Sequence, residues 1–245
     1  MGRYQNKVCV ITASATGIGF AIAKRMGQEG GKIVISSRNE KHVQAAVEEL
    51  RKEGIVAEGV VCHVGKDRQK LVDFAVDKFG GIDVLVNNAA VSTAFGPTMD
   101  ITELAYDRMF DINIKAGFFL LKTALPWLKK SKSPSVLFVS SYGGYAPSPA
   151  IGIYGVTKTA LIGMTKMLGI ELAGAGIRVN GIAPGIIKTR FSEAIWESEE
   201  VKRNPMGRMG NPGECASVAA FLCSDEASYV NGETVVIAGG YHARL

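Results

Sequence analysis

Tyr154 and Lys158 stand four residues apart in a helical pattern, so a helix would place the phenol and the ammonium one turn apart on one face. A free phenol has a pKa of about 10, and a neighbouring ammonium favours its ionised form. The pair could therefore move a proton near neutral pH. Because this spacing arises by chance about once in every two chains of such composition, its place in the fold must support the interpretation.

Ser141 ends a β-branched run and precedes Tyr154 by thirteen residues. A serine hydroxyl there could hydrogen-bond a substrate carbonyl, orient it and stabilise the negative charge that develops on its oxygen. Open α/β sheets bind their ligands at the edge where strands end. We therefore expect Ser141 to lie beside Tyr154.

The segment Thr12–Gly19 joins the first apolar run to the first helical pattern and contains Gly17 and Gly19. Glycines in this position let the backbone approach a pyrophosphate, which the free N–H groups and the dipole of a helix N-terminus attract. The segment therefore predicts a dinucleotide site. A plain strand–helix connection is the alternative.

The second apolar run ends in Ser36, Ser37, Arg38 and Asn39, with no carboxylate before Glu40. An NAD enzyme usually places Asp or Glu here to bind the ribose 2′-hydroxyl. A guanidinium beside small hydroxyls would instead attract a 2′-phosphate, which favours NADP(H). The alternative is that Arg38 is only a solvated surface cation.

Short β-branched runs alternate with helical patterns along the chain, which is typical of βαβ units and a parallel sheet. The predicted strands are Lys7–Thr12, Lys32–Ser36, Val56–Cys62, Asp83–Asn87, Ser135–Ser140, Arg178–Ile182 and Thr234–Ala238. The predicted helices are Gly17–Gly30, Glu40–Glu53, Gln69–Phe79, Glu103–Lys130, Tyr154–Ala173 and Gly213–Cys223. We expect one α/β domain over residues 1–245, a doubly wound seven-stranded parallel sheet with helices on both faces. The irregular segment Gly185–Pro212 is a predicted substrate loop.

The chain has 28 Lys and Arg against 23 Asp and Glu, a formal charge of +5. Its basic clusters are short and lack interleaved aromatic residues, so we expect no nucleic-acid partner. Its four cysteines show no C-x-x-C pairing, so neither a metal site nor a disulfide framework is predicted. No apolar stretch reaches the roughly 18 residues that cross a bilayer, so no membrane span is expected.

Together these residues resemble the short-chain dehydrogenase/reductase family over practically the whole chain. The shared motifs, in the family's order and spacing, are Thr12 with Gly17-x-Gly19, Asn87-Asn88-Ala89-Ala90, Asn113, Ser141, Tyr154-x-x-x-Lys158 and Pro184-Gly185. The resemblance implies a Rossmann-type fold with Tyr154 as general acid and base and Ser141 polarising the carbonyl. It also implies that Lys158 lowers the Tyr154 pKa and holds the nicotinamide ribose, and that Asn113 sustains a proton relay through water.

The family pattern and the glycine segment together predict the cofactor contacts. These are Ser14, Thr16, Gly17, Ile18, Gly19, Ser37, Arg38, Asn39, His63, Val64, Asn88, Ala89, Ala90, Tyr154, Lys158, Pro184, Gly185, Ile187 and Thr189.

Three positions depart from the family pattern. Ala13 replaces the first glycine of the phosphate loop, and we expect its methyl to require a negative φ. Ala90 replaces the glycine of Asn-Asn-Ala-Gly, a small change. His63 stands where many members have Asp, so a capping or surface role is the alternative to an adenine contact.

One branch of the family, the peroxisomal NADPH-dependent carbonyl reductases also described as retinal reductases, is similar to this chain in four segments: Thr12–Ala23, Ser36-Ser37-Arg38, Cys62–Lys66 and Phe221–Ser224. This resemblance implies hydride transfer from NADPH to ketones and aldehydes, with dicarbonyls, aromatic ketones and retinal as candidate substrates, and a homotetramer. Ala243-Arg244-Leu245 resembles an address read by a peroxisomal import receptor, and cytoplasmic residence is the alternative. Two other functions stay open: 3-oxoacyl reduction on a carrier, and a catalytically silent NADP-binding sensor or scaffold.

Overall fold

The computed structural model describes residues 2–93, 97–146, 149 and 151–241 of the chain. Its single sheet has seven parallel strands in the order β3-β2-β1-β4-β5-β6-β7. The strands are β1 (Val8–Ile11), β2 (Lys32–Ser37), β3 (Ala57–Val61), β4 (Val84–Asn87), β5 (Ser135–Val139), β6 (Arg178–Pro184) and β7 (Thr234–Ile237). The strand order reverses between β1 and β4, which is where doubly wound sheets bind ligands.

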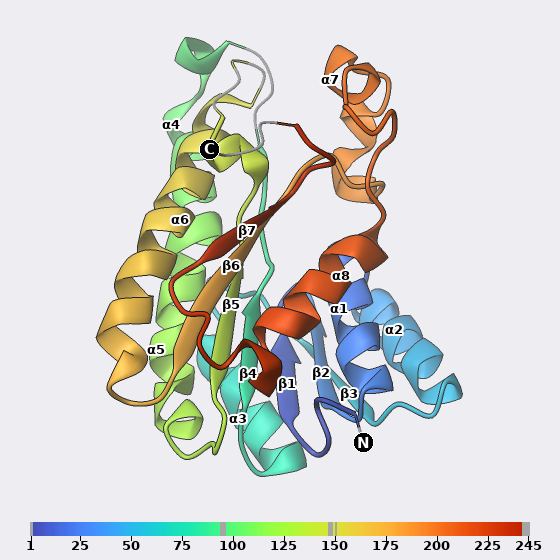
Figure 1. The fold of residues 1–245 in the computed structure, drawn as a ribbon, viewed down its shortest axis with the longest axis vertical. Coiled ribbons are helices and arrows are strands. Elements are labelled where there is room, and N and C mark those ends of the chain that lie inside the picture. Colours follow the sequence, from blue (N-terminus) through green and yellow to red (C-terminus); the bar gives the residue numbers. More distant parts are fainter. Residues whose placement is uncertain (1, 94–96, 147–148, 150, 242–245) are drawn as a thin grey trace.

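Helices cover both faces of the sheet (Figure 1). One face carries α1 (Gly17–Gln28), α2 (Glu40–Lys52) and α8 (Pro212–Leu222). The other carries α3 (Arg68–Phe79), α5 (Ala116–Leu128) and α6 (Gly152–Ala173), and α4 (Glu103–Phe110) leads into α5. The fold is therefore the predicted doubly wound α/β domain.

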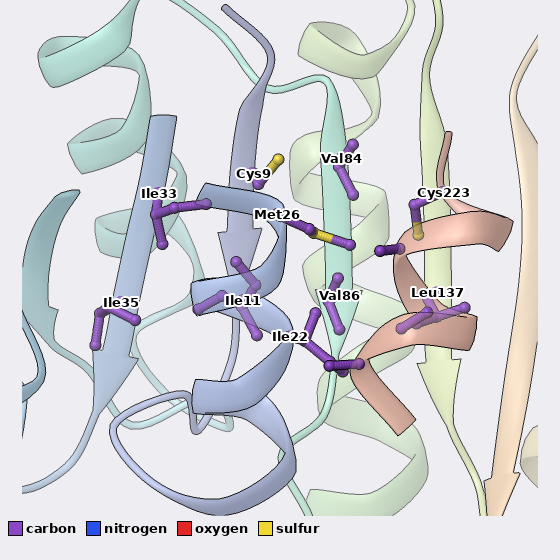
Figure 2. Packing of buried hydrophobic residues seen from close by; sticks show 14 of the residues in the cluster. Cys9, Ile11, Ile22, Met26, Ile33, Ile35, Val84, Val86, Leu137 and Cys223 are labelled. Carbon is purple, nitrogen blue, oxygen red and sulfur yellow. The ribbon is translucent and has the colours of Figure 1, made fainter. Parts of the chain in front are cut away.

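Strand side chains alternate between two hydrophobic cores. Cys9 and Ile11 of β1 pack into the core beneath α1 and α8, while Val10 packs into the core on the α3, α5 and α6 side. Figure 2 shows the first core, with Met26 of α1 and Cys223 at the end of α8 above the strands. Both faces of β1 are buried, which explains why it reads as a continuous apolar run in the sequence.

All the predicted strands and helices are present, and their ends lie within two residues of the predicted ends. The predicted helix Glu103–Lys130 is wrong in one respect, because a π turn, Asp111–Lys115, separates α4 from α5. A π turn inserts one residue into a helix and leaves the apolar pattern on either side readable. The helical period of the sequence therefore extends across it.

The segment Gly185–Pro212 follows β6 and rises above the carboxyl edge of the sheet (Figure 1). It contains a 3-10 turn, Arg190–Ile195, and the short helix α7 (Glu199–Lys202). Ile187 bridges to Gly210, so the two ends of the segment are tied together. This tie holds the 3-10 turn over the end of the sheet, next to Ser141 and Tyr154.

Candidate active site

Ser141 and Tyr154 lie in one groove at the carboxyl edge of the sheet, as predicted. The groove encloses about 330 Å³ and runs from Gly17 and Ile18 of α1 to Tyr154 and Lys158 of α6. Ser141 follows β5, and the 3-10 turn after it packs on α6 so closely that a Cβ on Gly144 would lie 2.8 Å from the Lys158 carbonyl carbon. This contact brings the serine to the helix that carries the phenol.

Lys158 is buried, with only 1% of its surface exposed. Its Nζ donates a hydrogen bond to the Val139 carbonyl at 2.8 Å and lies 5.4 Å from the centroid of the Tyr154 ring. Burial lowers the pKa of Lys158 to about 7, because the apolar surroundings disfavour the ammonium. The amine can therefore gain or lose a proton at neutral pH.

Tyr154 carries the phenol that faces the groove. Burial raises its pKa, and a hydrogen bond with the Ser141 hydroxyl acts in the opposite direction. Ser141 Oγ also accepts a hydrogen bond from the Gly143 N–H at 3.1 Å, which orients the serine. The phenol is thus neutral at pH 7 and holds the proton that a general acid must donate.

Lowering the Tyr154 pKa, as the family resemblance implies, requires positive charge in the groove. A protonated Lys158 amine and an oxidised nicotinamide ring would supply that charge. Burial acting alone has the opposite effect.

Asn113 lies in the π turn, behind the groove. Both hydrogens of its side-chain amide are used, since Nδ2 donates to the Val91 carbonyl and to Thr157 Oγ1, each at 3.0 Å. Its Oδ1 accepts from the Val91 N–H at 2.8 Å. The Asn113 side chain therefore clamps the loop after β4 to α6, and this amide has no hydrogen left to donate to a water.

Thr157 is a residue that the sequence did not single out. Its hydroxyl accepts from Asn113 and donates to the Tyr154 carbonyl at 2.7 Å. It thus connects the π turn to the helical turn that presents Tyr154 and Lys158. The only available signal was its position inside the Tyr-x-x-x-Lys pattern, one residue before the lysine.

The phosphate loop is held by side-chain bonds from the end of β4. Thr12 Oγ1 accepts from the N–H groups of Asn88 and Ala89, and Asn88 Nδ2 donates to the Thr12 and Ala13 carbonyls. Gly17 has a φ of +62°, the left-handed region that favours glycine. A Cβ on Gly19 would lie 2.8 Å from the Ala13 carbonyl oxygen. The two glycines are therefore required, one by conformation and one by close approach.

The prediction for Ala13 is wrong. Its φ is +49°, in the left-handed region, although a negative value was expected for a residue with a methyl group. The Asn88 bond to the Ala13 carbonyl, at 3.1 Å, and the packing of Gly19 beneath it hold the turn in the shape that a glycine would adopt. Tertiary contacts outweigh the local preference here.

The residues after β2 occupy two environments. Ser36 is buried and its N–H donates to Ser14 Oγ at 3.0 Å, so Ser14 ties the phosphate loop to β2. Arg38 is exposed, and no carboxylate side chain that the structure describes lies within ion-pair distance of it. Asn39 accepts the N–H of His42 and caps α2. Among the side chains that the structure describes, the Arg38 guanidinium at this strand end therefore has no carboxylate partner.

His63 folds back on its own turn. Its Nδ1 accepts the Gly65 N–H at 3.2 Å, and its own N–H donates to Asp67. This is the capping role given above as the alternative to an adenine contact. His63 and the neighbouring Val64 do not line the groove.

The residues after β6 form the opposite wall of the groove. A Cβ on Gly185 would lie 3.0 Å from Ala238, so glycine is needed for β6 and the end of β7 to pass closely. Thr189 lies across from Gly17, and the ring of Phe191 lies 6.0 Å from that of Tyr154. Phe191 belongs to the segment Gly185–Pro212, the predicted substrate loop.

The structure brings together some of the predicted site residues and not others. Those that line the groove are Thr16, Gly17, Ile18, Asn88, Ala90, Ser141, Tyr154, Lys158, Pro184, Gly185, Ile187 and Thr189. Those that do not are Ser14, Gly19, Ser37, Arg38, Asn39, His63, Val64, Ala89 and Asn113. In the described parts of the chain, no group of His, Cys, Asp or Glu could hold a metal ion, and no helix is long and apolar enough to cross a membrane.

Comparisons with known proteins match nearly the whole chain. A family model described as enoyl-(acyl carrier protein) reductase matches residues 12–242. Dehydrogenase/reductase SDR family member 4 of Homo sapiens is 50% identical over 98% of this chain and 89% of its own, and its Caenorhabditis elegans counterpart is 42% identical over 99% and 98%. The chain belongs to the short-chain dehydrogenase/reductase family.

Solved short-chain dehydrogenases/reductases have the same fold. A 7α-hydroxysteroid dehydrogenase in complex with NADH and 7-oxo glycochenodeoxycholic acid superposes with a TM-score of 0.92 at 30% identity, covering 97% of this chain and 95% of its own. A glucose/ribitol dehydrogenase from Brucella melitensis gives 0.92 at 33% identity, covering 99% of each chain. As a short-chain dehydrogenase/reductase, this protein is an oxidoreductase.

Proposed function

We propose that this short-chain dehydrogenase/reductase reduces ketones and aldehydes with NADPH. The observation that carries the proposal is the pairing of a neutral, half-buried phenol at Tyr154 with the Ser141 hydroxyl, beside the buried amine of Lys158. All three lie in one groove that continues to the N-terminus of α1. The relatives that carry the name dehydrogenase/reductase support the reaction class.

The residues of the groove fit a dinucleotide. Thr16 precedes α1 without making a side-chain cap, and the first turn of α1 contains no acidic residue, so its free N–H groups remain available to an anion. Gly17 leaves the backbone open to close approach at the same point, and Gly19 lets α1 pack closely beneath the Ala13 carbonyl. Lys158 and Pro184 stand toward the other end, where a nicotinamide ribose and ring would lie, and Thr189 lies across from Gly17. The cofactor would supply a hydride to the carbonyl carbon.

The side chains of the chain then handle the oxygen and its proton. Ser141 and Tyr154 both hydrogen-bond the carbonyl oxygen and stabilise its growing negative charge. Tyr154 donates its proton as the alkoxide forms. Lys158 stabilises the resulting phenolate when its amine is protonated, and it would hold the cofactor ribose. Thr157 and Asn113 fix the turn that presents both groups.

Removing the phenolic hydroxyl tests the mechanism. Tyr154→Phe should lower the turnover of a ketone by about 10²–10⁴-fold, because general acid catalysis is worth that much. NADPH binding, followed by the fluorescence of the bound nucleotide, should stay near the wild-type value. Tyr229→Phe removes a fully exposed phenol and is the matched control. Near-normal turnover by Tyr154→Phe with NADPH bound would rule out this mechanism.

The preference for NADPH rests on Arg38. Its unpaired guanidinium at the end of β2 is suited to a 2′-phosphate, and the neighbouring Ser36 and Ser37 offer no carboxylate for a 2′-hydroxyl. Arg38→Asp should raise the Kd for NADPH at least tenfold and leave the Kd for NADH nearly unchanged. Lys41→Asp, with the same charge change on exposed α2, controls for long-range effects. Equal weakening of NADPH and NADH would refute the 2′-phosphate contact.

Reduction of 3-oxoacyl groups on a carrier is the second candidate function. The matching family model is named for a reductase that acts on enoyl groups held on an acyl carrier protein. The net charge of +5 would suit an acidic carrier. Assays on diketones, aromatic ketones and retinal, in parallel with a 3-oxoacyl carrier, separate the two. NADPH binding without turnover of any of these would favour the silent sensor or scaffold.

The peroxisomal localisation stays a prediction. Ala243, Arg244 and Leu245 lie outside the residues that the structure describes. Fluorescence microscopy of an N-terminally tagged chain, with and without these three residues, would distinguish peroxisomal import from cytoplasmic residence.

A further inference from the structure

Arg190 is a positively charged side chain of the groove to which the catalytic scheme above gives no role. It is exposed, it lines the groove, and it opens the 3-10 turn that follows Thr189. No carboxylate among the side chains that the structure describes pairs with it. Elsewhere in the same segment, Arg208 forms an ion pair with Glu214, and Lys188 lies 5.8 Å from the centroid of the Trp196 ring.

The residues on either side of Arg190 face into the groove. The Thr189 methyl lies 3.4 Å from the point that a Cβ on Gly17 would occupy, so it faces the phosphate loop. Phe191 faces the phenol of Tyr154, with 6.0 Å between the ring centroids. Arg190 is therefore held at the outer rim, between the loop that would take the pyrophosphate and the phenol that would take the substrate.

The wall of the groove across from Thr189, the residue before Arg190, can bind an anion. The N-terminus of α1 has no cap from Thr16 and no acidic residue in its first turn, and Gly17 gives the backbone close access. A guanidinium can bind phosphate oxygens with two parallel hydrogen bonds. A pyrophosphate between the two walls would then meet helix N–H groups on one side and a guanidinium on the other.

We propose that Arg190 binds the pyrophosphate of the dinucleotide and closes the rim of the groove over it. The inference rests on the proposed function only in requiring that a nicotinamide dinucleotide binds. Arg38 would distinguish NADPH from NADH, whereas Arg190 would strengthen both equally, because both nucleotides carry the same pyrophosphate. Since an exposed ion pair is screened by solvent, the gain in affinity is about three- to tenfold at low salt and smaller at high salt.

Nucleotide titrations test the proposal directly. The Kd values of NADPH and NADH are measured from nucleotide fluorescence for the wild type, Arg190→Met, Arg190→Lys and Lys188→Met, at low salt and in about 0.5 M NaCl. Lys188→Met makes the same charge change two residues away, outside the groove. We expect Arg190→Met to raise both Kd values by about three- to tenfold at low salt. The Kd values of Arg190→Lys should lie between those of Arg190→Met and wild type. Those of Lys188→Met should stay within about twofold of wild type. In each variant, the ratio of the NADPH Kd to the NADH Kd should stay as in wild type.

Several outcomes would overturn the proposal. Unchanged Kd values for Arg190→Met would remove Arg190 from the cofactor site, and a loss confined to NADPH would assign it to the 2′-phosphate. Arg190→Met could also leave both Kd values unchanged and raise the KM for the anionic ketone 4-acetylbenzoate but not for its neutral methyl ester. This result would assign Arg190 to an anionic substrate. Wild-type protein that binds both nucleotides but reduces no carbonyl would refute the proposed function and leave this inference standing.

Discussion

At the scale of single residues, Lys158 shows how burial sets protonation. Its folded-state pKa of about 7 lies below the 10.5 of an exposed lysine. Between these two pH values the unfolded chain binds more protons than the folded chain, so the free energy of unfolding rises with pH. Below about pH 7 both states are protonated and the full cost of burying the ammonium is present.

Burial of Lys158 should therefore make the stability of the cofactor-free protein depend on pH. Lys158→Met should be more stable than wild type by an amount that grows as the pH falls from about 10 to about 7, reaching a few kcal/mol, and then levels off. Urea unfolding of both proteins across this pH range measures the difference. A difference that does not change with pH would mean that Lys158 titrates normally in the fold.

Ala13 shows a backbone held against its local preference. A φ of +49° costs an L-residue about 1 kcal/mol, which Ala13→Gly would relieve. Glycine also makes the unfolded chain more flexible, so the net gain should be a few tenths of a kcal/mol up to about 1 kcal/mol. Ala15→Gly, in the same loop without a positive φ, should instead destabilise by about 0.5–1 kcal/mol. Equilibrium urea unfolding of both variants checks the opposite signs.

At the scale of elements, the contact between the π turn and α6 decides how Tyr154 and Lys158 are presented. Thr157 makes this contact through one hydroxyl, which bonds Asn113 and the Tyr154 carbonyl. Thr157→Val keeps the shape but leaves a buried amide hydrogen of Asn113 without an acceptor, which costs about 1–3 kcal/mol.

We expect Thr157→Val to lower kcat while KM for the ketone and the Kd for NADPH change little, because Thr157 positions catalytic groups without touching either ligand. Thr157→Ser keeps the hydroxyl and should restore kcat. Steady-state kinetics at a temperature where all variants are folded, verified by circular dichroism, separates positioning from stability. Equal kcat for Thr157→Val and wild type would show that the clamp has no part in catalysis.

The elements themselves were readable from the sequence. Strands such as β1 and β5 are buried on both faces and appear as short β-branched runs, and α2 shows an apolar face at helical spacing. The π turn was missed because it adds one residue without a change in composition. The 3-10 turn Arg190–Ile195 and α7 were missed because they are too short to show a period.

At the scale of the whole molecule, exposed apolar side chains remain on α5 and α6 after the core is formed. Those with more than a third of their surface exposed are Phe119, Val156, Met167 and Ile170. Core packing therefore accounts for only part of the apolar content of these helices. We propose that this surface forms one dimer face of the homotetramer implied by the family resemblance.

Light scattering tests the assembly. The wild type should have about four times the 26.1 kDa chain mass, and Ile170→Glu, which charges a side chain 81% exposed, should reduce it. Val56→Glu charges a half-exposed side chain outside these helices and should leave the mass unchanged. A wild-type mass equal to that of one chain would remove the tetramer.

Properties carried by one stretch of chain could be read from the sequence, because the alternation of a strand and the turn of a helix repeat over a few residues. The sheet, the phosphate loop and the shared face of Tyr154 and Lys158 are of this kind. The sequence could not predict in this way the positive φ of Ala13, the Asn113–Thr157 clamp or the place of Thr189 across from Gly17. They arise from contacts between segments far apart in the chain, whose packing only the folded structure defines.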